Sequence, residues 1–121
     1  MRDVIERYKA IVIDFSLDEE LREDGGRRSK AVIKLVDHSR LDAYEGVFPY
    51  PSGTYRRYSF HWASAERILI IRWDNAPHHP HLENAPYHRH KGELIESSPE
   101  MTLDAVLQEI QRIILREDEE G

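Results

Sequence analysis

The sequence predicts an α+β fold: a curved antiparallel β-sheet of about five to six strands, with a C-terminal helix packed on one face and a short N-terminal helix. Two observations lead to this prediction. Apolar and polar residues alternate in several segments between residues 10 and 74, and only short turns separate them, as in an antiparallel meander. One apolar stripe at helical spacing follows near the C-terminus. The 121 residues contain no linker-like stretch, so we expect a single domain over 1–121.

The first part of the chain is expected to contain a helix and the meander. A short helix fits residues 1–9, because Val4, Ile5 and Tyr8 fall on one side of it. The meander over 10–74 begins with AIVIDFSL, whose inward-facing residues would be Ile11, Ile13, Phe15 and Leu17. Further strands are expected at KAVIKLV, LDAYEGVF, TYRRYSFHW and RILIIRW, which turn-forming residues separate.

The last hairpin of the meander has an expected register. If residues 64–65 form a two-residue turn, Trp62 and Trp73 share an apolar face. On the opposite face Arg57 then lies directly across from Arg72. Like charges in this arrangement destabilise a sheet unless an anion lies between them. The sequence therefore predicts an anion-binding site at these two arginines.

The C-terminal part begins with a proline-containing segment. Because proline lacks a backbone donor, we expect a histidine-rich loop over 75–92. An edge strand over 93–97 and a helix over 99–116 follow, with Ser98 or Thr102 as the helix cap. Residues 117–121 would form an acidic, solvated tail. The apolar stripe that would cover the sheet consists of Leu103, Val106, Leu107, Ile110 and Ile114.

The charge is distributed unevenly along the chain. The formal net charge is −6, but residues 1–25 sum to −4, residues 93–121 to −7 and residues 26–92 to +5. A basic middle can present a positive face, because exposed charges more than ~8 Å apart are largely screened. The absence of cysteine excludes disulfides and thiolate metal sites. No apolar run is long enough to cross a membrane and the N-terminus carries acidic residues, so we expect a cytoplasmic protein.

Histidines are concentrated in RWDNAPHHPHLENAPYHRH, residues 72–90, which contains five of the seven histidines. An octet occurs there twice, as DNAPHHPH from Asp74 and as ENAPYHRH from Glu83, and each copy ends in His-x-His. The two pairs, His79 with His81 and His88 with His90, could bind a divalent transition metal such as Zn. The spacing matches no standard structural zinc pattern. The other alternative is an exposed loop whose histidines have no function.

Acid–base chemistry is a further use for these histidines. One imidazole can accept a proton while another donates one, as cleavage of RNA through its 2′-hydroxyl requires, and no metal is needed. Cations would stabilise the charge on the phosphorane, and a tyrosine could stack a base. For His61 in SFHW, a structural role in its strand is the alternative to a functional one. The candidate phosphate- and RNA-binding residues are Arg57, Arg72, Arg89, Lys91 and Tyr87.

Three motifs resemble the TumE family of bacterial toxin–antitoxin systems: YSFHW at 58–62, RWDNAPHH at 72–79 and APYHRHKGELIES at 85–97. The resemblance extends in order over roughly 44–115. The chain departs from the family pattern with phenylalanine in YSFHW, and with tyrosine and arginine in APYHRH.

This resemblance implies a small growth-inhibiting toxin that a cognate antitoxin neutralises by direct binding. We expect a metal-independent ribonuclease, by analogy with other small toxins, and RNA and a second copy of the chain are further candidate partners. A non-enzymatic module whose loop binds a metal or a partner protein is the alternative. The candidate catalytic residues are His79, His88, His90, His78, His61 and Asp74.

Overall fold

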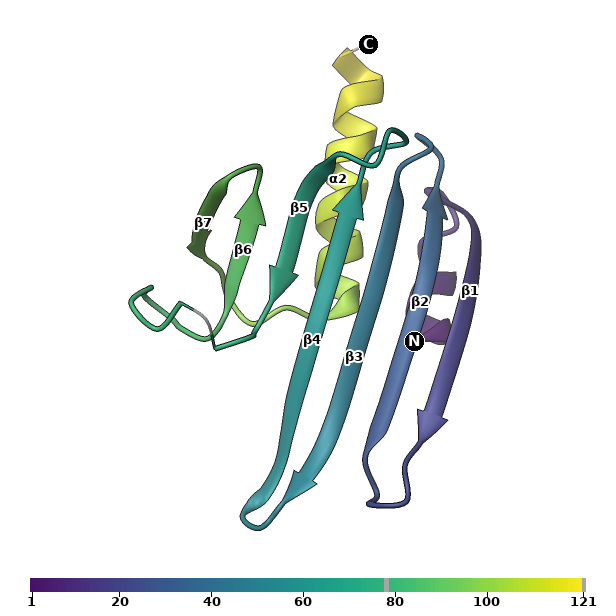
Figure 1. The fold of residues 1–121 in the computed structure, drawn as a ribbon. Coiled ribbons are helices and arrows are strands. Elements are labelled where there is room, and N and C mark those ends of the chain that lie inside the picture. Colours follow the sequence, from purple (N-terminus) through teal and green to yellow (C-terminus); the bar gives the residue numbers. More distant parts are fainter. Residues whose placement is uncertain (78, 121) are drawn as a thin grey trace.

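The computed structural model describes residues 1–77 and 79–120, and their strands form one seven-stranded antiparallel sheet (Figure 1). The order of the strands in the sheet follows the chain, from β1 to β7. This meander confirms the predicted α+β class, with more strands than the five to six expected. The elements are α1 (Arg2–Glu6), β1 (Val12–Leu21), β2 (Arg27–Leu35), β3 (Arg40–Tyr50), β4 (Gly53–Ala63), β5 (Leu69–Asp74), β6 (His88–Lys91), β7 (Leu94–Ser97) and α2 (Leu103–Glu120).

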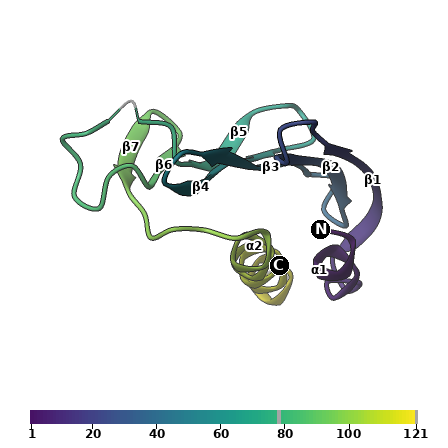
Figure 2. The same ribbon diagram turned by 90° about the horizontal axis from the view of Figure 1, so that it is seen from below.

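Both helices cover the same face of the sheet, and the other face is left open (Figure 2). The core lies between the helices and the covered face, where alternate residues of each strand are buried. All five residues of the predicted stripe on α2 are buried in this core. The hydroxyl of Tyr8 donates to Asp104 Oδ1 over 2.7 Å and so joins the segment after α1 to α2. Burial and Asp104 raise the pKa of Tyr8 to about 12, which keeps this donor protonated.

Strand β1 departs from the predicted alternation. The pairing with β2 shifts between Val12 and Asp14, so Ile13 is the extra residue of a bulge. Its side chain is 58% exposed, and the prediction that it faces inward is wrong. Phe15 and Leu17 return to the covered side, where they are partly buried against the core.

The register of β4 and β5 differs from the predicted one. The connection is longer than two residues, because the Ser64 amide donates to the Ile68 carbonyl over 2.8 Å. As a result Arg72 lies across from His61, and Arg57 is paired on its other side with Gly46 of β3. The expected site between two facing arginines is therefore wrong. Trp62 and Trp73 do share the covered face, and each is 1% exposed.

The segment after β5 contains a strand that was not predicted from the sequence. Strand β6 lies within the stretch expected to be loop, because the three prolines all precede it and leave its amides free to pair with β5 and β7. Helix α2 begins at Leu103 rather than 99, and Thr102 Oγ1 caps it by accepting the Ala105 amide hydrogen over 3.1 Å. Its backbone continues to Glu120, into the expected tail, whose last residue lies outside the described part.

Candidate functional site

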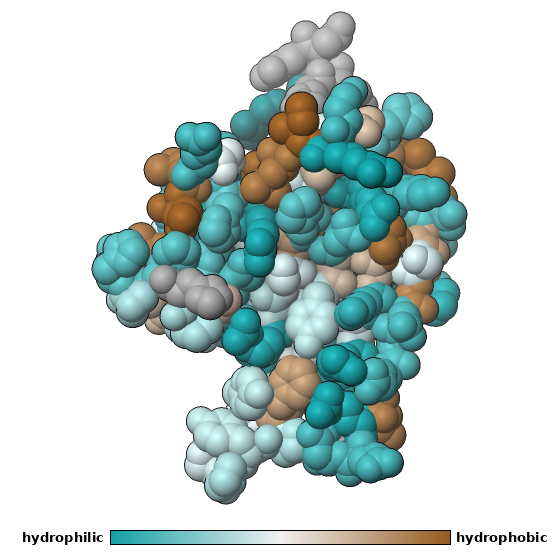
Figure 3. Space-filling model, in the orientation of Figure 1, coloured by the Kyte–Doolittle hydropathy of each residue, from teal (hydrophilic) through white to brown (hydrophobic). Residues whose placement is uncertain are grey.

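The open face of the sheet holds the histidines. Asp74 of β5 is paired with His88 of β6, and Arg72 is paired with His90. Side chains alternate between the two faces, and Trp73 between them is buried against the helices. The four polar side chains therefore point to the open face, which Figure 3 shows to be mostly hydrophilic. His61 joins them, because it lies across from Arg72 on β4.

Asp74 is the centre of the site, and its side chain is only 4% exposed. Its Oδ1 lies 2.9 Å from His88 Nε2 and accepts the Ala76 amide hydrogen over 3.0 Å. Its Oδ2 forms an ion pair with Arg72 and lies 3.0 Å from Nε. The N–H group of Nε does not point at this oxygen well enough to form a hydrogen bond. His90 Nε2 lies farther away, at 3.9 Å from the same oxygen. A buried carboxylate needs such partners, because an uncompensated charge is costly in the interior.

His88 is held at both ring nitrogens, and its side chain is 2% exposed. The Pro86 carbonyl lies 2.9 Å from Nδ1, and a carbonyl can only accept, so Nδ1 carries a hydrogen. Nε2 lies within hydrogen-bond distance of the Asp74 carboxyl, at 2.9 Å from Oδ1. Neither nitrogen is free, and we infer that His88 positions its neighbours rather than contacting a substrate.

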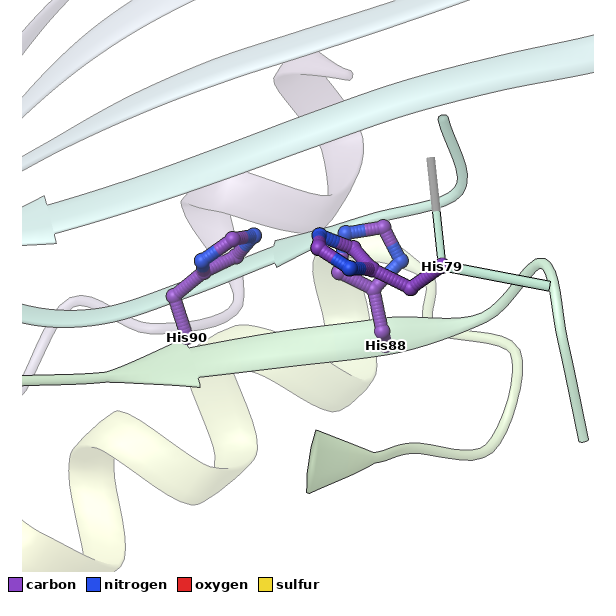
Figure 4. Close-up of side chains that lie close together, drawn as sticks. All are labelled: His79, His88 and His90. Carbon is purple, nitrogen blue, oxygen red and sulfur yellow. The ribbon is translucent and has the colours of Figure 1, made fainter. Parts of the chain in front are cut away.

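His79 and His90 complete a cluster around His88 (Figure 4). The ring centroid of His88 lies 5.0 Å from that of His79 and 5.0 Å from that of His90. The His79 and His90 centroids are 5.9 Å apart. The rings lie on the same side of β6, with His79 supplied by the segment before it. We call His79, His88 and His90 the histidine cluster.

Two asparagines hold the segment that carries His79, and sequence reasoning missed this role. Buried Asn75 accepts from the Tyr58 amide over 2.9 Å and donates to the Arg56 carbonyl over 2.7 Å. Asn84 donates to the Ser98 carbonyl over 2.9 Å and has a φ of 64°, a conformation that asparagine tolerates. The repeated Asn-Ala-Pro was the available signal. Asparagine before Ala-Pro is typical of a local turn, whereas both side chains here bind distant backbone.

His90 is suited to accept a proton. Burial lowers its pKa below the ordinary value, and the nearby His88, Arg72 and His79 lower it further, while Asp74 raises it. The neutral imidazole is therefore the main form at neutral pH. Its side chain is 24% exposed, so a substrate can reach it.

The histidine cluster could also hold a metal ion, since one ligand atom from each residue lies within 4.8 Å of the others. Imidazoles at such separations suit Zn and similar ions. However, His88 would first have to release Asp74 or Pro86. His81 lies beside His79, with centroids 5.9 Å apart, but is not part of this group. His78 lies outside the described residues.

Three of the predicted RNA-binding residues lie away from the cluster. Arg89 points to the covered side, where it pairs with Glu96 at 2.5 Å and Glu109 at 3.5 Å. Tyr87 and Lys91 lie two residues before and after Arg89, so they alternate with the histidines as Arg89 does. Tyr87 is partly buried against the core. The sequence could not separate these residues from the histidines, because only the strand geometry of 88–91 sends neighbours to opposite faces.

Other predicted residues do lie on the open face. His61 lines a shallow hollow of about 210 Å³ together with Tyr44 and Ser59. Arg57 lies nearby on β4, and its Nε is buried without a hydrogen-bond partner among the described residues. Another hollow, of about 430 Å³, is lined by Met1 and parts of β1, β2 and β3 and contains no histidine, so we place the site at the cluster.

An open antiparallel meander backed by two helices, with a histidine cluster on its bare face, defines a small α+β protein. The family described as "Toxin TumE" matches residues 1–114. The chain therefore belongs to the TumE toxin family. No curated protein and no solved structure matches it. Among the described residues, no helix is long and apolar enough to span a membrane.

Proposed function

We propose that this toxin acts as a metal-independent ribonuclease and that the histidine cluster is its active site. The observation that carries the proposal is the buried Asp74–His88 pair, beside which the partly exposed rings of His79 and His90 lie edge-on with their centroids 5.9 Å apart. This arrangement brings together rings from two segments, because His79 precedes β6 and His90 belongs to it. It offers a proton acceptor and a proton donor at distances suited to one phosphodiester.

The proposed reaction assigns a role to each group. Neutral His90 removes the proton of the 2′-hydroxyl, whose oxygen attacks phosphorus. His79 acts as the general acid and donates a proton to the departing 5′-oxygen, so the products are a 2′,3′-cyclic phosphate and a 5′-hydroxyl end. Arg72 lies in the row of His90 and stabilises the charge on the phosphorane. Asp74 and His88 hold the other groups in place.

Growth and RNA integrity after induced expression test this proposal. His90→Ala and His79→Ala should abolish growth arrest and RNA cleavage. His81→Ala is the matched control, because His81 lies in the same segment but outside the cluster, and it should remain toxic. Purified wild type should produce 2′,3′-cyclic phosphate ends in the presence of EDTA. Intact RNA in arrested cells would contradict the ribonuclease.

A divalent metal site is the second candidate, favoured by the separation of the three imidazoles. It predicts about one metal ion per chain in protein purified without a tag. It also predicts a drop in melting temperature on chelation, because a ligand that binds the native state stabilises it. Activity that persists in EDTA together with metal-free protein would exclude this candidate.

Membership of the family implies an antitoxin partner. A protein that neutralises the toxin must block either the histidine cluster or the path to it. We propose that it covers the open face, because the other face of the sheet is already occupied by α1 and α2 (Figure 2).

A further inference from the structure

Aromatic side chains gather on the open face at the end of β3 and β4 that is distant from α2. Phe48 is paired with Tyr55 across the strands, and their ring centroids are 5.4 Å apart. The ring of Tyr50 packs edge-on against that of Tyr55, with the ring centroids 5.6 Å apart. Tyr50 is 54% exposed and Tyr55 is 46% exposed. We call Phe48, Tyr50 and Tyr55 the aromatic platform, and large exposed aromatic groups of this kind indicate a binding surface.

Gly46 allows this platform to lie close to the sheet. A Cβ at this position would lie 2.6 Å from the Phe48 ring and 2.8 Å from the Tyr44 hydroxyl oxygen. Any other residue would force both side chains away. The bare backbone at Gly46 therefore lets aromatic surface continue from the platform to Tyr44, which lines the hollow beside His61.

The charges of the open face leave Arg57 as the place for an anionic group, because Arg28, Arg40 and Arg72 are each ion-paired with a carboxylate. The basic residues that share this face on β2 to β5 outnumber the two acidic ones, and one of those, Asp74, is buried. On β1, however, Asp14, Asp18 and Glu20 share this face and lie opposite the basic residues of β2, so they offset those charges. Arg57 is next to the platform on β4, and in the described part of the chain its Nε has no hydrogen-bond partner. The basic residues, placed by their pairing with each other, are Arg28, Lys30, Lys34, Arg40, Arg57 and Arg72.

These features follow one line along β4. Tyr55, Arg57, Ser59 and His61 occupy alternate positions, and they span about 20 Å of extended strand. Figure 3 looks onto this line and shows pale, weakly polar residues over the middle and lower part of the face. The line begins at the aromatic platform, passes Arg57 and the hollow, and ends at the row that contains Arg72 and His90.

We propose that the open face binds single-stranded RNA along β4, with bases stacked on the aromatic platform and a phosphate at Arg57, so that the strand reaches the histidine cluster. Stacking on side chains requires bases that are not already paired, which favours a single strand over a duplex. Sheet surfaces with exposed aromatic groups bind single strands in this way. The choice of RNA rests on the proposed ribonuclease, whereas the binding surface rests on the aromatic platform and Arg57 alone.

Fluorescence anisotropy tests the proposal with a labelled 2′-O-methyl RNA of about 12 nucleotides, a length within the range of single-stranded sites. This probe cannot be cleaved through its 2′-position. Tyr55→Ala should weaken binding by roughly 5- to 100-fold, and Tyr55→Phe should restore it, because the ring is what stacks. Arg57→Ala should weaken binding and reduce the slope of log affinity against log salt by about 1. Arg27→Ala, an exposed arginine on the covered side of β2, is the matched control and should bind as wild type.

The outcomes separate this inference from the proposed reaction. Binding that weakens as described, by a protein that cuts no RNA, supports the surface and rejects the ribonuclease. Cleavage that is unchanged in Tyr55→Ala and Arg57→Ala rejects the surface and leaves the ribonuclease. Equal losses in Arg27→Ala and Arg57→Ala would show only general attraction and overturn the proposal. Loss of antitoxin binding in these variants, with no RNA binding by wild type, would make this face a protein interface and also overturn it.

Discussion

The buried pair of Asp74 and His88 can be tested by a double-mutant cycle. Asp74→Asn and His88→Gln each remove one partner and leave the other polar group buried, since the two side chains are 4% and 2% exposed. Breaking a buried pair in this way costs about 3–5 kcal/mol of unfolding free energy. The double variant leaves two neutral amides that can bond to each other. It should therefore cost at least about 2 kcal/mol less than the sum of the single changes.

Urea unfolding gives the free energies for this cycle. Trp62 and Trp73 are each 1% exposed, so their fluorescence reports unfolding of the core. A chain of this length has roughly 6–18 kcal/mol of stability, so the single variants should still fold. Effects that add to within about 0.5 kcal/mol would refute the coupling. The exposed pair of Arg40 and Asp42, 2.7 Å apart, is the control and should show a coupling of about 0–1 kcal/mol.

Three further predictions concern single residues. Tyr8→Phe removes a hydroxyl that donates to α2 and should cost about 1 kcal/mol in urea unfolding; an unchanged midpoint would contradict the contact. Asn75→Ala leaves the Tyr58 amide and Arg56 carbonyl without partners, so we expect a loss of about 2–3 kcal/mol and weaker growth inhibition. If neutral His90 is the base, cleavage should fall as pH decreases, with its midpoint below the ordinary histidine pKa of about 6.5, because burial lowers the pKa of His90. A midpoint above this value would exclude that role.

The sequence by itself determined the class of fold and, except for Ile13, the apolar residues named for the covered face. Alternation at period two marked the strands of the meander, and the stripe on α2 was correct at every position. These patterns are local, because each depends only on which side chains of one element must be buried. The histidine motifs also indicated the family, whose model matches residues 1–114.

The tertiary structure alone decided how the site is assembled. Asp74 meets His88 because β5 and β6 pair in one register across an intervening segment, and no local pattern specifies that register. The same geometry sends Arg89 to the covered side although it lies between two histidines of the open face. The longer turn before Ile68 moved Arg72 away from Arg57 and opposite His61. Composition and periodicity fix what each strand buries, whereas long-range pairing fixes which polar groups become neighbours.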